Sequence, residues 1–229
     1  TTVGAAGSLL LGVNYALVYW GAQHLSSGLV AIVLAATPIV ALALGTALRI
    51  EVASAAKFAA VLLGFAGVVL VFRSEATLEG SRASAGLAAV LVSTVCVAGA
   101  YVWMKRHAAR VSPLAMAAIQ NAAGLLPLAT LAFGFEGSPL GAAWTPRSLA
   151  ALAYLAWAAS IVAFCLNYWL LARMDPSAML MMGVAEVPLA IGLGALVLHE
   201  RIPTGTLLGA ACIAASVLLG PMRRTPSAG

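Results

Sequence analysis

The stretch "ALVYWGAQHLSSG" at residues 16–28 shares a Tyr-Trp pair with "CLNYWLLARMDPS" at residues 165–177. The two pairs are Tyr19-Trp20 and Tyr168-Trp169, which are 149 positions apart. If neighbouring residues keep the same spacing, the chain contains two copies of one structural unit. The fold and the function would then follow from that duplication.

The composition identifies the class of protein. Hydrophobic residues make up 63% of the 229 residues, charged residues 8%, and the mean hydropathy is +1.04. A soluble domain carries about 25% charged residues, so this chain cannot build a water-soluble surface. The acids lie at or beyond the ends of apolar runs, and only Glu186 lies inside one. The sequence therefore predicts an all-α integral membrane protein.

Eight apolar stretches are long enough for membrane-spanning helices, which need roughly 17–25 residues. We predict them at residues 7–24, 28–48, 54–72, 84–104, 113–135, 148–172, 177–198 and 204–220. Eight Lys and Arg residues fall on the side of the C-terminus and four on the other side, which predicts a cytoplasmic C-terminus. The excess of Arg over Lys is typical of a GC-rich bacterial gene, so we expect a multi-pass protein of the bacterial inner membrane.

The spacing of 149 also relates the spans. It aligns Ala36 with Ala185, Gly45 with Gly194 and Glu51 with Glu200. The first three spans are thus equivalent to the last three. Because equivalent spans are five apart, an odd number, the two copies must cross the membrane in opposite directions. Inverted repeats of this kind are common in secondary transporters.

Two pairs of segments resemble a known family. The segments "LAATPIVALALGTALRIE" (34–51) and "KFAAVLLGFAGVVLVF" (57–72) are similar to the EamA domain of the drug/metabolite transporter superfamily, and so are "VAEVPLAIGLGALVLHERI" (184–202) and "GTLLGAACIAASVLLG" (205–220). That domain has a proline within one helix and a Glu at its end, which Pro38 and Glu51 match. The second copy matches with Glu186 and Glu200, but its Pro188 lies one place later than the spacing requires.

The resemblance implies a domain organisation. Family members usually have ten spans in two inverted repeats of five helices. On that pattern, residues 1–72 form an incomplete first repeat of three helices that lacks the first two of the ten, and residues 84–221 form a complete second repeat of five. Residues 73–83 are then an extramembrane loop and residues 222–229 a cytoplasmic tail.

The resemblance also implies a function. We expect a secondary transporter that moves a small organic metabolite, amino-acid-like or amphipathic, across the inner membrane by alternating access, in the direction of export. A proton is the candidate coupling ion, and membrane lipid is the other expected partner. The alternatives are a membrane scaffold or enzyme subunit without transport, and a lipid-linked sugar flippase.

Other classes of function lack support in the sequence. It contains no P-loop, no GxSxG elbow and no HExxH motif, so we expect no enzyme, no cofactor and no metal site. The basic residues are scattered at segment ends without forming a stripe, so nucleic acid is not an expected partner.

Glu186 is the leading candidate for a functional side chain. A carboxylate near the middle of a span costs roughly 2.5–3.5 kcal/mol to insert, so it should face a cavity or a partner. Its functional role would be to bind a cationic group or to carry a proton. Its structural role would be to hydrogen-bond a neighbouring helix in the protonated form.

Further candidates fall into three groups. Polar and aromatic residues within the spans are candidates for the substrate pathway: Asn14, Tyr15, Thr37, Tyr101, Gln120, Asn121, Tyr154, Trp157 and Asn167. For the four amides among them, hydrogen bonding between helices is the alternative. Pro38 and Pro188 free backbone carbonyls and predict kinks or hinges. Residues near span ends are predicted at the membrane interface or in gates: Glu51, Glu200, Tyr19, Trp20, Tyr168 and Trp169.

Overall fold

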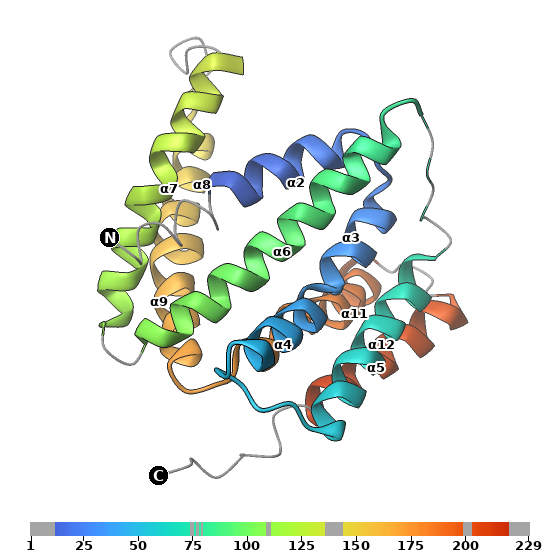
Figure 1. Cartoon of the computed structure of the whole chain (residues 1–229). Helices are drawn as coiled ribbons and strands as arrows, with labels where there is room; N and C mark the ends of the chain where they lie inside the picture. The colour runs from blue at the N-terminus through green and yellow to red at the C-terminus, as the bar shows by residue number, and fades with distance from the viewer. Residues whose placement is uncertain are drawn as a thin grey trace.

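The computed structural model describes residues 12–73, 76, 78, 80–108, 111–135, 144–198 and 203–219. Their regular structure is helical throughout, which confirms the all-α prediction for this part of the chain (Figure 1). The helices are α2 (Asn14–Ala22), α3 (Ser27–Ala35), α4 (Thr37–Ala47), α5 (Ala55–Phe72), α6 (Ala83–Ala108), α7 (Pro113–Phe135), α8 (Pro146–Tyr154), the π-helix η3 (Leu155–Val162), α9 (Ala163–Leu171), α10 (Pro176–Val184), α11 (Glu186–Leu198) and α12 (Thr204–Leu219).

Five helical stretches of the described chain are long and apolar enough to cross a membrane. They are Ser27–Ala47, Ala55–Phe72, Ala83–His107, Pro146–Leu171 and Pro176–Leu193. Helix α12 is also apolar but has 16 residues. The chain is therefore a multi-pass membrane protein by the length and composition of its helices.

The predicted span 28–48 is interrupted at Ala36, which separates α3 from α4. Pro38 causes the interruption, because a proline has no N–H to donate to the carbonyl four residues earlier, that of Leu34. The hydroxyl of Thr37 donates to the Leu34 carbonyl instead. The backbone is thus satisfied at membrane depth although the helix is broken.

A second interruption lies at Ala185, between α10 and α11, three residues before Pro188. The N–H of Ala185 donates to the carbonyls of Met181 and Met182 at 3.2 and 3.1 Å, which tightens the last turn of α10. Glu186 is consequently the first residue of a new helix.

Helices α5 and α12 pack closely through small residues, and Figure 1 shows them side by side. A Cβ at Gly67 would lie 2.7 Å from the Gly209 carbonyl oxygen, and one at Gly64 would lie 2.8 Å from the Ser216 hydroxyl. Residue numbers rise along α5 as they fall along α12, so the two helices run antiparallel. Glycine at these positions permits backbone contact that larger side chains would prevent.

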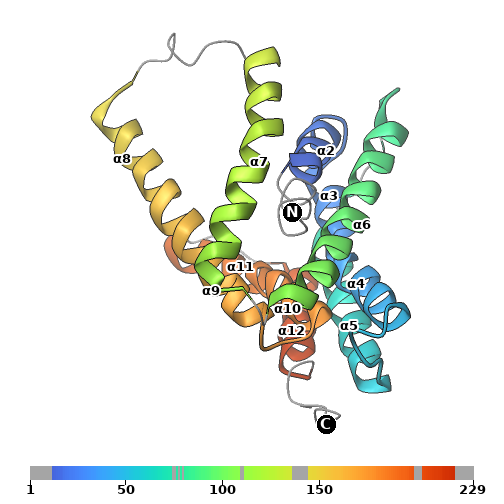
Figure 2. The same cartoon turned by 60° about the vertical axis from the view of Figure 1, so that its left-hand side comes forward.

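Helices α7 and α8 extend away from the other helices, as Figure 2 shows. Helix α7 packs against α9, and the two contact α6 through a buried cluster that includes Met104, Met116, Tyr168 and Leu171. Tyr168 is 1% exposed, so it contacts protein here, in contrast to the interfacial position predicted for it. The reason is that α7 covers this face of α9, whereas Tyr19, Trp20 and Trp169 remain exposed.

Candidate functional site

A cavity of about 380 Å³, which we name the central cavity, lies beside both helix interruptions. Seven helices contribute to its wall, from both ends of the sequence. The lining residues are Asn14, Tyr15, Val18, Ala31, Leu34, Ala35, Thr37, Pro38, Val68, Val97, Leu180, Gly183, Val184 and Val187. The structure thereby brings together four of the predicted residues: Asn14, Tyr15, Thr37 and Pro38.

The polar groups in the wall of the central cavity are mostly engaged by neighbouring protein atoms. Asn14 is buried, and its Oδ1 accepts a hydrogen bond of 2.6 Å from the hydroxyl of Ser93 on α6. Thr37 is buried and bonded to the Leu34 carbonyl. Tyr15 is 38% exposed, and its ring stacks on that of Tyr19 with centroids 5.9 Å apart. The remaining wall is aliphatic, which suits a largely apolar ligand.

Glu186 begins α11 directly after the interruption, and its side chain is exposed. It makes no hydrogen bond or ion pair with other described residues, although it lies within electrostatic range of Tyr101. The next residue, Val187, lines the central cavity. The unpaired N–H groups at the start of a helix favour a negative charge, so the helix itself stabilises this carboxylate.

The other predicted polar residues of the spans do not line the central cavity. The Tyr101 hydroxyl on α6 donates to Asn167 Oδ1 on α9 at 3.2 Å, which joins two helices. Asn121 Nδ2 donates to the Ala117 carbonyl of its own helix at 2.8 Å. Gln120 is fully buried in α7, and its side-chain nitrogen and oxygen have no hydrogen-bond partner among the described residues.

The remaining predicted aromatic residues lie on the outer surface. Tyr154 and Trp157 are exposed, and they line neither the central cavity nor the second cavity described below. Trp20 packs against the ring of His24 at a centroid distance of 4.6 Å, and the Arg173 guanidinium lies 3.9 Å above the Trp169 ring. Glu200 lies outside the described residues.

Glu51 is placed quite differently from an exposed interfacial residue. Its side chain is fully buried, and its Oε1 lies 3.1 Å from Lys57 Nζ, which also lies 2.6 Å from Asp175 Oδ2. The Ser177 hydroxyl donates to Glu51 Oε1, and the Ser177 N–H donates to Oε2 at 3.3 Å. We name Glu51, Lys57, Asp175 and Ser177 the Glu51 cluster. Glu51 thus forms an ion pair with a lysine of α5 and accepts hydrogen bonds from a serine at the start of α10.

Sequence reasoning missed three of these four residues. Lys57 and Asp175 each lie beside a predicted turn, and neither was among the predicted site residues. Their position at the same predicted end of the molecule was a usable signal, because charges at span ends commonly pair. Lys105 was missed as well: its Nζ donates to the carbonyls of Leu171 and Met174 at 2.7 and 2.6 Å.

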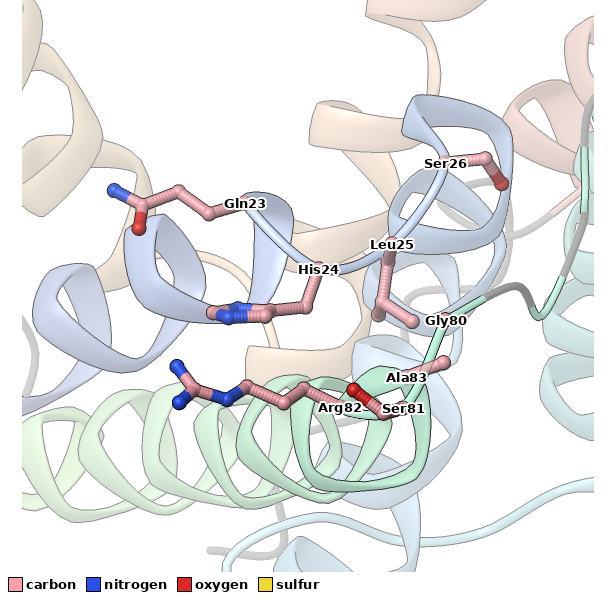
Figure 3. A pocket seen from close by; sticks show the side chains of 8 residues that line it. All are labelled: Gln23, His24, Leu25, Ser26, Gly80, Ser81, Arg82 and Ala83. Carbon is pink, nitrogen blue, oxygen red and sulfur yellow. The ribbon is translucent and has the colours of Figure 1, made fainter.

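A second cavity, of about 450 Å³, lies at the α2–α3 turn and the start of α6 (Figure 3). It is lined by Gln23, His24, Leu25, Ser26, Gly80, Ser81, Arg82 and Ala83. Figure 3 shows the His24 ring and the Arg82 side chain on facing elements. Within the described part of the chain, no group of three or more His, Cys, Asp or Glu residues could hold a metal ion.

Comparisons with known proteins identify the family, and the family match covers the second of the two motif-bearing parts of the chain. The sequence model of the EamA-like transporter family matches residues 84–220. The uncharacterized transporter YoaV of Bacillus subtilis (strain 168) is 25% identical over 213 residues, which cover 93% of this chain and 73% of that protein. Since the family match spans more than half of the chain, this protein belongs to the EamA-like transporter family of the drug/metabolite transporter superfamily.

Proposed function

We propose that this protein is a secondary transporter that moves a small amphipathic metabolite out of a bacterial cell by alternating access. The central cavity carries this proposal, because it lies beside two helix interruptions and is lined by Val187, the residue that follows Glu186. Broken helices that border a site near mid-membrane are a recurrent feature of secondary transporters. Family membership supports transport as the general activity and agrees with the absence of enzymatic motifs.

Helix positions support two inverted repeats as the basis of the mechanism. Four pairs of helices begin 149 positions apart: α2 and α9, α3 and α10, α4 and α11, and α5 and α12. The contacts between α5 and α12 follow the same spacing. Gly64 is equivalent to Ile213 and Gly67 to Ser216, so the contact of Gly64 with Ser216 and the contact of Gly67 with Ile213 exchange when the two repeats are interchanged. Together with their antiparallel course, this exchange is what a two-fold axis in the membrane plane would produce.

The same scheme extends to the arrangement in the membrane. All eight predicted spans would cross the bilayer, with the α4–α5 turn, the α9–α10 turn and the C-terminus on the cytoplasmic side. Figure 1 is consistent with this arrangement, since these turns lie at one end of the molecule and the α2–α3 turn and the start of α6 lie at the other.

The chemistry of the central cavity supports a class of substrate. Its wall is mostly aliphatic, and one tyrosine is partly exposed. An apolar or aromatic body of modest size fits such a wall, and an ammonium group or a proton fits the carboxylate of Glu186. An amino-acid-like or amphipathic metabolite combines these features.

Glu186→Gln tests the proposal, because glutamine keeps the shape of the side chain and removes both the negative charge and the titratable proton. Bacterial cells that express the parent, the variant or an empty vector would be compared by metabolite profiling of cytosol and medium. We expect the parent to shift at least one amphipathic metabolite from the cytosol to the medium. We expect Glu186→Gln to lose most of that shift at equal abundance in the membrane.

Glu79→Gln, an acid of the 73–83 segment, serves as the matched control and should keep the parent profile. A parent profile identical to that of empty cells would contradict transport of metabolites. Stable co-purification with a membrane enzyme would then favour the scaffold, and a change confined to lipid-linked sugars would favour the flippase. Normal export by Glu186→Gln would assign Glu186 a structural role.

A further inference from the structure

We propose that the Glu51 cluster is the gate that closes the central cavity toward the cytoplasm. This inference rests on the proposed function for the reaction it serves, but its geometry is independent of the substrate. The cluster joins the turn after α4 and the start of α5 to the α9–α10 turn and the start of α10. These elements belong to the two halves of the sequence, which must separate on one side of a transporter when that side opens.

The contacts within the cluster depend on one another. Lys57 Nζ bridges two carboxylates and donates to the Val52 carbonyl at 3.0 Å. Glu51 in turn accepts from the backbone and the side chain of Ser177 at the start of α10. Buried charges are stable only when all partners are present or when water replaces them. The cluster therefore has two stable arrangements, one assembled and dry and one separated and hydrated.

The backbone holds Glu51 in position for this contact. Helix α4 ends in a Schellman arrangement, in which the Ile50 N–H donates to the Gly45 carbonyl at 2.8 Å and Arg49 takes a positive φ of 55°. The turn directs Glu51 back against α4, and a Cβ at Gly45 would lie 3.3 Å from Glu51 Oε2. Glycine at position 45 thus leaves room for the buried carboxylate.

The cluster also lies between the central cavity and the end of the molecule. Leu180 of α10 lines the cavity and packs against the buried cluster of Ala41, Ala98 and Val102. Ile50, which directly precedes Glu51, packs against the same cluster. A path from the cavity toward the predicted cytoplasmic side would pass between α4 and α10, which are packed together at this point. Separation of the Glu51 cluster would open that path.

At the opposite end of the molecule, the described helices that are equivalent to α4 and α10 pack less closely, and Glu200, the equivalent of Glu51, lies outside the described residues. The spacing of 149 relates Asp175 to Ser26 and the pair α4–α10 to the pair α11–α3. Over the described residues, α3 and α11 have at most marginal contact, whereas α4 and α10 pack together. Ser26 instead borders the second cavity, shown in Figure 3. Among the described residues, the helices thus pack more closely at the end that holds the cluster.

The test measures accessibility in the full chain without its native cysteines. Leu180→Cys reports access from the cytoplasmic side in inside-out vesicles, and Ala31→Cys reports access to the same cavity from the opposite side in right-side-out vesicles. An impermeant maleimide is the probe. We expect Lys57→Met to raise the labelling rate of Leu180→Cys roughly tenfold or more, because removing one partner of a buried ion pair strongly favours the separated arrangement. Labelling of Ala31→Cys should slow, because the two sides open alternately.

Two further variants keep the test decisive. Arg106→Gln removes an exposed charge at the same predicted side and should leave both rates unchanged. Ser177→Ala keeps every charge of the cluster, so it should fold and should raise the Leu180→Cys rate by a smaller factor. Equal rates in Lys57→Met, Ser177→Ala and the parent, or faster labelling of both reporters, would overturn the gate. Because labelling needs no substrate, its outcome is separate from that of the export assay.

Discussion

The contact between α5 and α12 allows a quantitative prediction for Gly67→Ala. A Cβ at residue 67 would lie 2.7 Å from the Gly209 carbonyl oxygen and 2.8 Å from Ile213 Cγ1. The first neighbour is backbone, which cannot rotate away as the end of a flexible side chain can. The two helices would have to separate by roughly 0.5–1 Å to restore an ordinary contact distance.

The cost of this separation follows from measured effects of overpacking. An extra methyl group in a well-packed interior destabilises by about 1–3 kcal/mol. For a chain of this length, 1 kcal/mol corresponds to about 2–4 °C in Tm, so Gly67→Ala should lower Tm by roughly 2–12 °C. Gly99→Ala is the matched control, because a Cβ at Gly99 of α6 meets no other atom within 4 Å.

The assay is the thermal unfolding of both purified variants in one detergent, followed by tryptophan fluorescence and by the loss of monodisperse protein on gel filtration. Gly99→Ala should match or slightly exceed the parent, because alanine has the higher helix propensity. A Tm of Gly67→Ala equal to that of Gly99→Ala would refute the close antiparallel packing of α5 and α12. It would also remove one support for the two-fold relation between the repeats.

Two further predictions concern topology and the contact between α2 and α6. In a chain without native cysteines, Ser26→Cys should react with an impermeant thiol reagent from the periplasm, and Ser54→Cys should not. Both serines cap helices. Reaction of both from one side would contradict the inverted repeat. Ser93→Ala leaves the buried Asn14 amide without its 2.6 Å partner and should lower the unfolding free energy by about 1–2 kcal/mol, with the exposed Ser84→Ala unchanged in the same unfolding assay.

Helix positions were largely predictable because apolar composition and capping residues act locally. The predicted spans 54–72 and 113–135 differ by at most one residue from α5 and α7. Ser54 illustrates the reason, since its side chain accepts from the Lys57 N–H and begins α5 where the polar turn ends. The kinks expected from Pro38 and Pro188 have counterparts in the interruptions at Ala36 and Ala185.

Other features depend on contacts between distant segments, which one sequence does not encode in a readable way. Glu51 and Ser177 are 126 positions apart, and nothing in either segment alone indicates that they meet. The position of Tyr168 depends on coverage by α7, so its residue type could not separate a core position from an interfacial one. The π-helix η3 arises within an ordinary Ala-rich span and has no local signal that we can identify.

The two halves differ most where their equivalent residues have different chemistry. Thr37 and Glu186 are 149 positions apart, and each is the first residue after a helix interruption. The Thr37 hydroxyl donates to the Leu34 carbonyl, so in the first half this side chain satisfies the backbone group that Pro38 leaves without a donor. Glu186 has no hydrogen-bond or ion-pair partner among the described residues and keeps its carboxylate exposed at a helix start that favours negative charge. On the proposed function, a substrate ammonium or a proton at this level would therefore meet a carboxylate in the second half and a hydroxyl in the first. Coupling should accordingly depend on movement of α11, while α4 supplies the packed surface against which α10 closes.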